Sequence, residues 1–252
     1  MPQTFRASQV ATPRGSRVAV YEAGAERGTR ILVVGGFTSR PVCEGPLVES
    51  LGKAISRGAR CTMIDLASCG NSRCGGELTM DTWVEDLAFV AGARSDADTV
   101  FVGLSMGAWV MLALHQRERL PVRAMCALAP AIDWDAEYVW PGIERGRFRK
   151  DGKYVMTAEK RLLPVSLLES MEKFRLNGKT FEARAPIHVI QGERDELVSF
   201  EAARKFARGA TGSPCTFESL PEQDHQVSKL MTIPARLAFE RWLLARVPEA
   251  AA

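Results

Sequence analysis

The chain has few of the features that mark specialised protein classes. Six cysteines in 252 residues are too sparse for a disulfide scaffold, and no Cys-x-x-Cys pair offers the spacing of a zinc site. No stretch approaches the roughly 18 apolar residues of a membrane span, and the N-terminus lacks the apolar core of a signal peptide. We therefore expect a soluble, cytoplasmic protein with reduced thiols and no bound metal.

A strong charge of either sign is also missing. The 33 basic and 30 acidic side chains give a net charge of +3, which predicts neither a nucleic-acid partner nor a membrane partner. A local exception is residues 145–150, where four of six side chains are basic. Such a run either contacts an anionic group or forms a solvated face, and the sequence leaves both interpretations open.

Apolar runs and helical stretches alternate along the chain. The length and the 46% apolar content suit one large domain, residues 1–252. Short runs rich in β-branched residues are typical of strands in parallel β-α-β units. They lie at residues 16–21, 31–34, 61–65, 99–104, 124–128, 187–191 and 215–219. Residues 45–57 and 81–93 have helical periodicity, with Asp81 expected as the N-cap of the second helix. We predict the α/β class, a mostly parallel sheet with helices on both faces.

The alternation stops between residues 131 and 185. This stretch is rich in Trp, Tyr, Arg and Gly, and it is far longer than an ordinary connection in a compact domain. It would leave from the carboxyl end of a strand, where open α/β sheets bind ligands. We interpret it as a cap inserted into the single domain.

Ser105 is the candidate nucleophile. It occupies the centre of Gly-Leu-Ser-Met-Gly, directly after the apolar run 99–104 and directly before an apolar helical stretch. This strand-turn-helix context is the one in which G-x-S-x-G forms a strained turn that exposes a serine. The glycines at 103 and 107 leave room for the turn, and the following helix directs its N-terminal amides at developing negative charge.

His225 is the candidate base among three histidines. His115 falls about three turns into the helix after Ser105, too far to turn back, and we expect it to be solvated. His188 alternates within a strand, where its ring should pack or bond to a neighbouring element. His225 lies in a polar loop after the last strand, and such loops supply catalytic groups.

Asp195 is the candidate acid that orients the histidine. The order along the chain in this type of site is serine, then acid, then histidine, and Gly192 makes the turn out of strand 187–191 three residues before Asp195. The sequence leaves four alternatives open, which are Glu193, Glu196, Asp133 and Asp135.

Two backbone amides are candidates for an oxyanion hole. The first is that of Met106, the residue after the nucleophile. The second comes from the loop after strand 31–34, where paired glycines allow close backbone approach; Phe37 is our choice and Gly36 the alternative.

Several motifs in the same order resemble the α/β-hydrolase superfamily over nearly the whole chain. They are the Gly-Gly-Phe loop at 35–37, the loop 65–72, the turn 103–107, residues 192–198 and the pair Asp224-His225. Many relatives have His-Gly where this chain has Gly35-Gly36. Residues 105–109, 83–86 and 191–195 are similar to a small esterase and thioesterase group that includes mitochondrial palmitoyl-protein thioesterase. The resemblance implies an α/β-hydrolase fold and cleavage of thioesters or acyl glucuronides.

These residues predict a serine hydrolase that cleaves a small-molecule carboxylic ester or thioester through an acyl-enzyme, with no cofactor. Two alternatives stay open: a specialised lactone or carbon-carbon hydrolase, and a catalytically silent binding protein. Trp134, Tyr138 and Trp140 are the candidate substrate-binding residues. With Phe148 and Tyr154, these aromatic residues either line the cap for an apolar acyl group or only pack it on the core.

Overall fold

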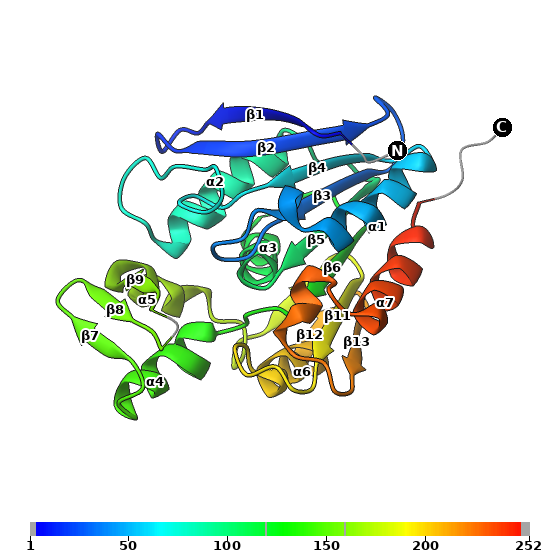
Figure 1. Ribbon diagram of the computed structural model, residues 1–252. Helices are drawn as coiled ribbons and strands as arrows, with labels where there is room; N and C mark the ends of the chain where they lie inside the picture. The colour runs from blue at the N-terminus through cyan, green and yellow to red at the C-terminus, as the bar shows by residue number, and fades with distance from the viewer. Residues whose placement is uncertain (1–3, 119, 159, 248–252) are drawn as a thin grey trace.

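The protein is built around one large sheet with helices on both faces. The computed structural model describes residues 4–118, 120–158 and 160–247 (Figure 1). The eight strands run in the order β1-β2-β4-β3-β5-β6-β11-β13, and all neighbours from β4 onward are parallel. The expected α/β class with a mostly parallel sheet is therefore confirmed. The strands are β1 (Arg6–Ala11), β2 (Arg17–Gly24), β3 (Arg30–Val34), β4 (Arg60–Ile64), β5 (Thr99–Leu104), β6 (Ala124–Leu128), β11 (Ile187–Gly192) and β13 (Cys215–Leu220).

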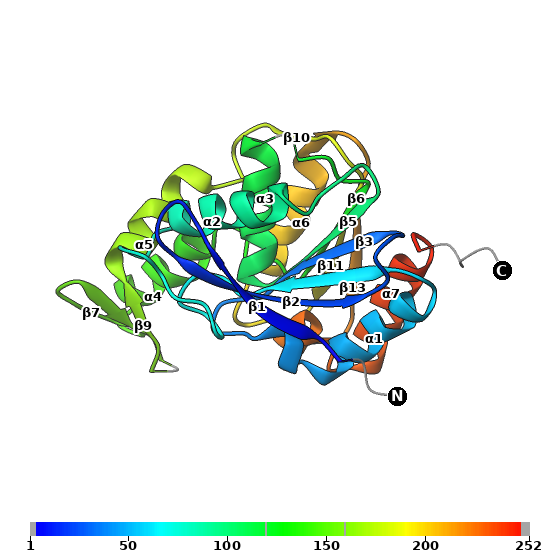
Figure 2. The ribbon, with the colours of Figure 1, turned by 90° about the horizontal axis from the view of Figure 1, so that it is seen from above.

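Five helices cover the two faces of this sheet. Figure 2 shows α1 (Gly45–Ser56) and α7 (Ile233–Leu244) on one face, with α2 (Met80–Gly92), α3 (Met106–Arg117) and α6 (Phe200–Gly209) on the other. Helix α1 buries Leu47, Leu51 and Ala54, which share one face by their spacing of three and four residues. Residues 106–115 of α3 are buried all round because α3 lies between the sheet and α2.

One local expectation was wrong, and one strand was missed. The N-cap of α2 is Thr79, whose hydroxyl accepts a hydrogen bond from the Thr82 amide at 3.1 Å. Asp81 lies instead in the first turn, where a carboxylate also favours a helix start, and it pairs with Lys173 at 2.6 Å. Strand β1 was not predicted because its side chains are almost all exposed, so its sequence has no apolar alternation.

The segment interpreted as a cap forms small elements beside the carboxyl edge of the sheet (Figure 1). Strands β7, β8 and β9 make a separate antiparallel sheet, whereas β10 pairs with β12 next to α6. Within the described residues, no helix is long and apolar enough to cross a bilayer. The elements are a π-helical turn η2 (Asp135–Val139), α4 (Trp140–Glu144), β7 (Arg149–Asp151), β8 (Tyr154–Met156), β9 (Leu162–Pro164), α5 (Val165–Met171), the 3-10 turn η3 (Glu172–Phe174) and β10 (Phe181–Ala183), with β12 at Ala210–Gly212.

Candidate active site

Ser105 stands on a strained turn at the carboxyl end of the central strand β5. Its backbone has φ 51° and ψ −116°, a conformation that residues with side chains rarely adopt. Added Cβ atoms would lie 2.4 Å from the Cα of Ala108 at Gly103, and 2.3 Å from the carbonyl oxygen of Gly35 at Gly107. Both glycines are therefore needed for the close packing of this turn against α3 and β3.

Three residues from distant parts of the chain form one hydrogen-bonded chain. The Ser105 Oγ lies 3.0 Å from Nε2 of His225, and Nδ1 of His225 lies 2.8 Å from Oδ2 of Asp195. His225 begins the 3-10 turn η4 (His225–Lys229) after β13, and Asp195 follows β11. The side chain of His225 is 21% exposed, whereas that of Asp195 is fully buried. The fold thus brings together the three residues that the sequence predicted as nucleophile, base and acid.

The Asp195 carboxylate is held by hydrogen bonds on both oxygens. Oδ1 accepts from the amides of Leu197 and Val198, each at 3.0 Å. Oδ2 accepts from Nε2 of Gln191 at 3.0 Å, besides its contact with His225. Because an ionised carboxylate only accepts, Nδ1 of His225 must donate, and Nε2 of the neutral ring is left to accept the Ser105 proton. Gln191 is fully buried, and its part in this arrangement was not anticipated.

The alternative acids lie elsewhere or have other partners. Glu193 and Glu196 are exposed. Asp133 is buried and accepts hydrogen bonds from the amides of Leu176 and Asn177. Asp135 pairs with Arg175 at 2.6 Å. Both aspartates therefore fasten the loop 175–177 to the end of β6, and neither has a hydrogen bond to His225.

The two other histidines are structural. The ring of His188 bonds to Thr216 and Glu218 on β13 and stacks on Trp242, as its strand position suggested. His115 is buried rather than solvated, which corrects our expectation. Its Nε2 accepts the Arg184 amide at 3.0 Å, because the segment before β11 packs over the end of α3. Burial, together with the positive charge of Arg184, lowers the pKa of His115 to about 4.

The loop after β3 lies against the nucleophile. A Cβ added to Gly36 would be 3.1 Å from that of Ser105, so only the bare backbone fits this closely. The ring of Phe37 packs 5.8 Å from that of Trp83. Among the described residues no acceptor is recorded for the Phe37 amide, and the Met106 amide, at the first position of α3, has no intrahelical acceptor.

Cys69 contacts this loop, a role that the sequence did not suggest. Its Sγ accepts the Thr38 amide at 3.4 Å, directly after Phe37, and Thr38 has a positive φ of 62°. Burial raises the pKa of the Cys69 thiol to about 11, so the sulfur stays protonated near neutral pH. The loop 65–72 is therefore in hydrogen-bond contact with the loop that carries Phe37.

A cavity of about 170 Å³ opens at Ser105 and His225. Trp134 and Tyr138 line it, four residues apart on one helical face, with their rings stacked at 5.6 Å. Trp140 does not line it, contrary to our expectation. It lies two residues beyond Tyr138 on another side of the helix, where Lys150 sits over its ring. Among the described residues, no group of three or more His, Cys, Asp or Glu side chains is arranged to hold a metal ion.

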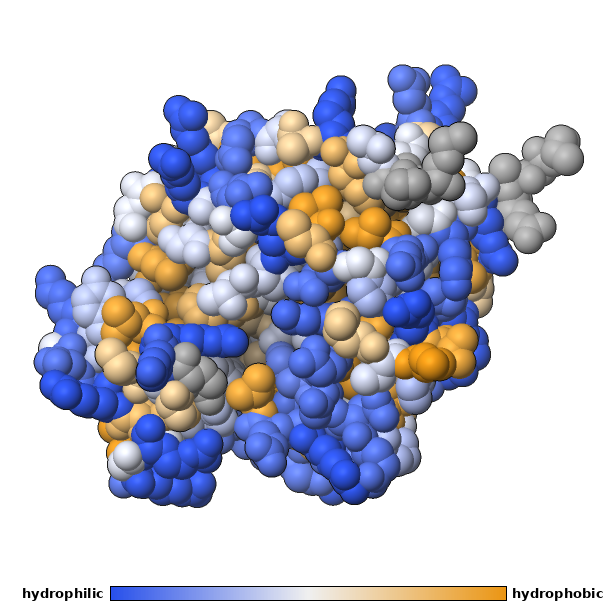
Figure 3. Space-filling view, viewed as in Figure 1, coloured by the Kyte–Doolittle hydropathy of each residue, from blue (hydrophilic) through white to orange (hydrophobic). Residues whose placement is uncertain are grey.

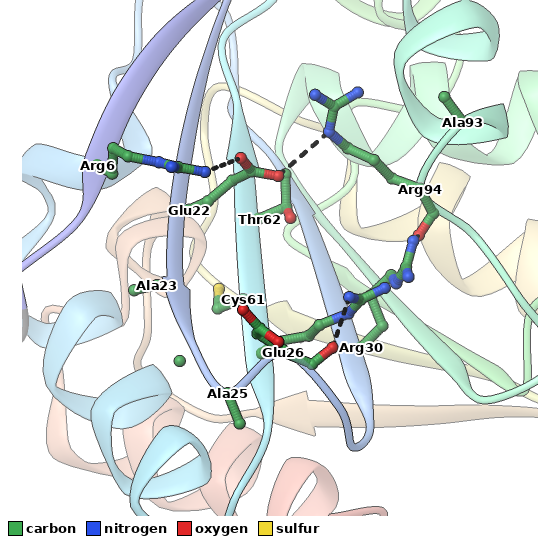
Figure 4. A pocket seen from close by; sticks show the side chains of 12 residues that line it. Arg6, Glu22, Ala23, Ala25, Glu26, Arg30, Cys61, Thr62, Ala93 and Arg94 are labelled. Carbon is green, nitrogen blue, oxygen red and sulfur yellow. Dashed lines mark hydrogen bonds and ion pairs between the residues drawn. The ribbon is translucent and has the colours of Figure 1, made fainter.

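A larger hollow, of about 710 Å³, lies at the opposite edge of the sheet, beside the starts of β3 and β4. Four arginines and two glutamates line it: Arg6, Arg30, Arg60, Arg94, Glu22 and Glu26. Figure 4 shows Arg6 and Arg94 both directed at Glu22. The two ion pairs have N–O distances of 3.6 Å and 3.4 Å. No serine, histidine or cysteine with an activating partner is present there, so the chemistry gathers at the smaller cavity.

Comparisons with known proteins agree with this architecture. The model of the family described as "Alpha/beta hydrolase family" matches residues 31–242. A solved protein from Agrobacterium vitis S4 superposes with a TM-score of 0.78 and 19% identity over 98% of this chain and 100% of that one. Alpha/beta hydrolase domain-containing protein 10 from mouse gives 0.77 and 18%, over 95% and 97%. Est1E from Butyrivibrio proteoclasticus, with bound ferulic acid, gives 0.72 and 19%, over 95% and 99%. At these identities the structural likeness establishes the fold. No curated protein matches the chain.

Proposed function

This chain belongs to the alpha/beta hydrolase family and is a hydrolase, and we propose that it is a serine esterase that cleaves small carboxylic esters or thioesters. The observation that carries the proposal is the continuous chain Ser105–His225–Asp195, with contacts of 3.0 and 2.8 Å. A serine hydroxyl is a weak nucleophile unless a base takes its proton, and a fully bonded, buried carboxylate keeps the base in the correct tautomer.

The mechanism follows from these contacts. The Ser105 oxygen bonds to the substrate carbonyl carbon while its proton passes to Nε2 of His225. The carbonyl oxygen becomes an anion, for which we assign the amides of Met106 and Phe37 as donors. Collapse of this intermediate breaks the bond to the leaving group, which receives the proton from His225. Water then gives a proton to His225 and adds to the acyl-enzyme. The bond between the acyl carbon and the Ser105 oxygen breaks, the proton on His225 returns to that oxygen, and the acid leaves.

The cavity favours a small acyl group with an apolar or aromatic surface. Pockets for drug-sized ligands measure about 300–1,000 Å³, whereas this one has about 170 Å³. The stacked rings of Trp134 and Tyr138, with Leu197 and Val198, provide a flat apolar wall. Est1E, which shares the fold, binds ferulic acid, an aromatic acid of modest size. We therefore propose esters of small aromatic or short aliphatic acids as the substrate class.

The test is hydrolysis of p-nitrophenyl esters of increasing acyl length, with matched thioesters, by wild type, Ser105→Ala and His225→Gln. We expect kcat to fall by about 10⁴-fold or more in both variants, because the residues of such a triad act as a unit. His188→Gln is the matched control, since this histidine bonds only to β13 and stacks on Trp242. It should retain activity. Substantial turnover by folded Ser105→Ala would overturn the mechanism. The ratio of kcat/KM for esters to that for matched thioesters shows whether the enzyme prefers an oxygen or a sulfur leaving group.

A further inference from the structure

The net charge of the chain is concentrated in one segment. Residues 145–161 contain seven basic and two acidic side chains, a net charge of +5 in a chain with +3 overall. The rest of the molecule is therefore slightly acidic. The segment carries β7 and β8 and the loop that leads to β9, so the charge gathers around one small antiparallel sheet, hereafter the basic sheet (residues 145–164).

The basic sheet exposes apolar side chains on its outer face. Val155 and Leu163 point inward and are fully buried, as the alternation of a strand requires. Their neighbours Tyr154, Met156 and Leu162 are 50%, 44% and 58% exposed, and Met156 is paired with Leu162 across the strands. Figure 3 shows apolar and hydrophilic surface side by side at the end of the molecule where Figure 1 places β7–β9.

Most of the positive charge on the basic sheet is not neutralised by ion pairs within the described residues. Arg149 pairs with Asp151 at 3.0 Å, and within the described residues this is the one ion pair that any of them makes. Arg147 lies over the rings of Tyr138 and Phe148, and Lys150 lies over Trp140. These two contacts leave the charge of the side chains in place, but the register puts Lys150 on the inner face with Val155. The exposed cations that flank the outer apolar side chains are Lys153, directly before Tyr154, and Lys160, two residues before Leu162; within the described residues neither has an ion pair.

A second exposed apolar patch provides a contrast. Met231, Ile233 and Leu237 are exposed at the start of α7, but the nearby cations are each paired with a carboxylate: Lys229 with Glu44, Arg236 with Glu49 and Arg241 with Glu218. Apart from the single ring of Phe89 on α2, the large exposed apolar side chains of the described residues therefore gather at two places. Of these two places, only the basic sheet combines them with unpaired positive charge among the described residues.

We propose that the basic sheet docks on the surface of an anionic lipid bilayer. Apolar side chains that enter the headgroup region, ringed by Lys and Arg that meet anionic lipids, are the combination by which proteins bind such surfaces without crossing them. The near-neutral net charge of the whole chain hid this feature, because the cations are local to one element. The binding itself is independent of the chemistry at Ser105.

Docking there has a consequence for the candidate active site, which rests on the proposed function. Thr157 and Arg161, from the turn between β8 and β9, line the cavity at Ser105. The surface that meets the bilayer is thus continuous with the rim of the cavity. Esters dissolved in the outer layer of the membrane would reach Ser105 over a short path.

The test is co-sedimentation of the full chain with vesicles of phosphatidylcholine alone or mixed with phosphatidylglycerol, at low and high salt. We expect binding to the mixed vesicles only, weakened by salt. Each basic residue near an anionic surface strengthens binding about fivefold, so Lys153→Gln with Lys160→Gln should lower it on the order of 20-fold. Leu162→Ser should lower it several-fold.

The controls are matched in charge and in exposure. Lys205→Gln with Arg208→Gln removes two exposed cations from α6, and Ile233→Ser removes an apolar side chain that is 73% exposed on α7. Both should bind as wild type does. Equal binding to neutral vesicles, no binding to mixed vesicles at low salt, or an equal loss in the α6 control would overturn the proposal. Hydrolysis of soluble esters should be unchanged in every variant, so a failure of docking is distinct from a failure of the proposed chemistry.

Discussion

The two edges of the main sheet use left-handed backbone in different ways. At the carboxyl edge, residues with side chains adopt positive φ after five strands: Thr38, Ser68, Ser105, Ala129 and Glu222 follow β3, β4, β5, β6 and β13. At the amino edge the positive φ angles belong to glycines, at Gly24, Gly28 and Gly58. Glycine takes this conformation at little steric cost, whereas the other residues store strain that the surrounding structure must maintain.

The same contrast holds for charge. The hollow at the amino edge is about four times larger, but its arginines are taken up by Glu22, by Asp96 and by backbone carbonyl groups. At the carboxyl edge, the smaller cavity holds a serine and a histidine whose hydrogen bonds lead to a buried carboxylate. The carboxyl edge therefore differs from the amino edge in its strained backbone and its hydrogen-bonded serine and histidine, and not in the volume of its cavity.

The largest expected effect comes from Asp195→Asn at the carboxyl edge. The amide oxygen can still accept from Leu197 and Val198, but its NH₂ group then faces Nδ1 of His225 and favours the tautomer with the proton on Nε2. Ester hydrolysis should fall about 10⁴-fold with little loss of stability. Steady-state kinetics and thermal unfolding measure the two effects.

Glu193→Gln is the matched control for this substitution. Its carboxylate is two residues away and exposed, so the same chemical change should leave kcat within a few fold. A drop in this variant comparable with that of Asp195→Asn would mean that the acid is wrongly assigned.

A pair of Gly→Ala substitutions tests the two edges directly. Gly36→Ala places a methyl group 3.1 Å from Ser105 Cβ and from the Leu104 carbonyl oxygen, which displaces the loop that carries Phe37. We expect kcat to fall about 10- to 100-fold, less than the loss of a whole oxyanion donor. Gly24→Ala, with φ 99° and a 2.3 Å approach to the Ala59 carbonyl oxygen, should cost about 2–3 kcal/mol of stability and leave kcat intact. Denaturant unfolding and steady-state kinetics on both variants measure the two effects. A loss of kcat in Gly24→Ala with normal kcat in Gly36→Ala would contradict the comparison.

The smallest expected effect concerns His115, near the end of α3 that is remote from Ser105. Its pKa is about 4 in the folded protein against 6.5 in its ordinary state, so the unfolded chain binds an extra proton between these values. Stability should therefore fall as pH drops from about 6.5 toward 4, by on the order of 2 kcal/mol. In His115→Gln this part of the pH dependence should disappear. Parallel slopes for wild type and variant in urea unfolding from pH 7 to pH 4.5 would contradict the assignment.

The sequence predicted those parts of the candidate site that a short motif, or the order of residues along the chain, identifies. The Gly-Leu-Ser-Met-Gly turn and the order of Ser105, Asp195 and His225 pointed to the groups that the fold brings within 3.0 Å. Gln191 and Cys69 were missed as supports because neither lies in a local pattern that signals its partner. Their hydrogen bonds join them to Asp195 and to the loop after β3 through packing.

By itself, the sequence determined the alternation of strands and helices and the strained turn at Ser105, since both depend on neighbours a few residues away. Only the tertiary structure decided that His115 is buried and that Trp140 does not line the cavity. It also decided that the cations near α7 are paired, whereas within the described residues Arg149 alone is paired among the cations of the basic sheet. These outcomes depend on which distant segments pack together, such as Arg184 over α3 and Glu44 beside Lys229. Burial and charge compensation are properties of such contacts, and no spacing along the chain encodes them directly.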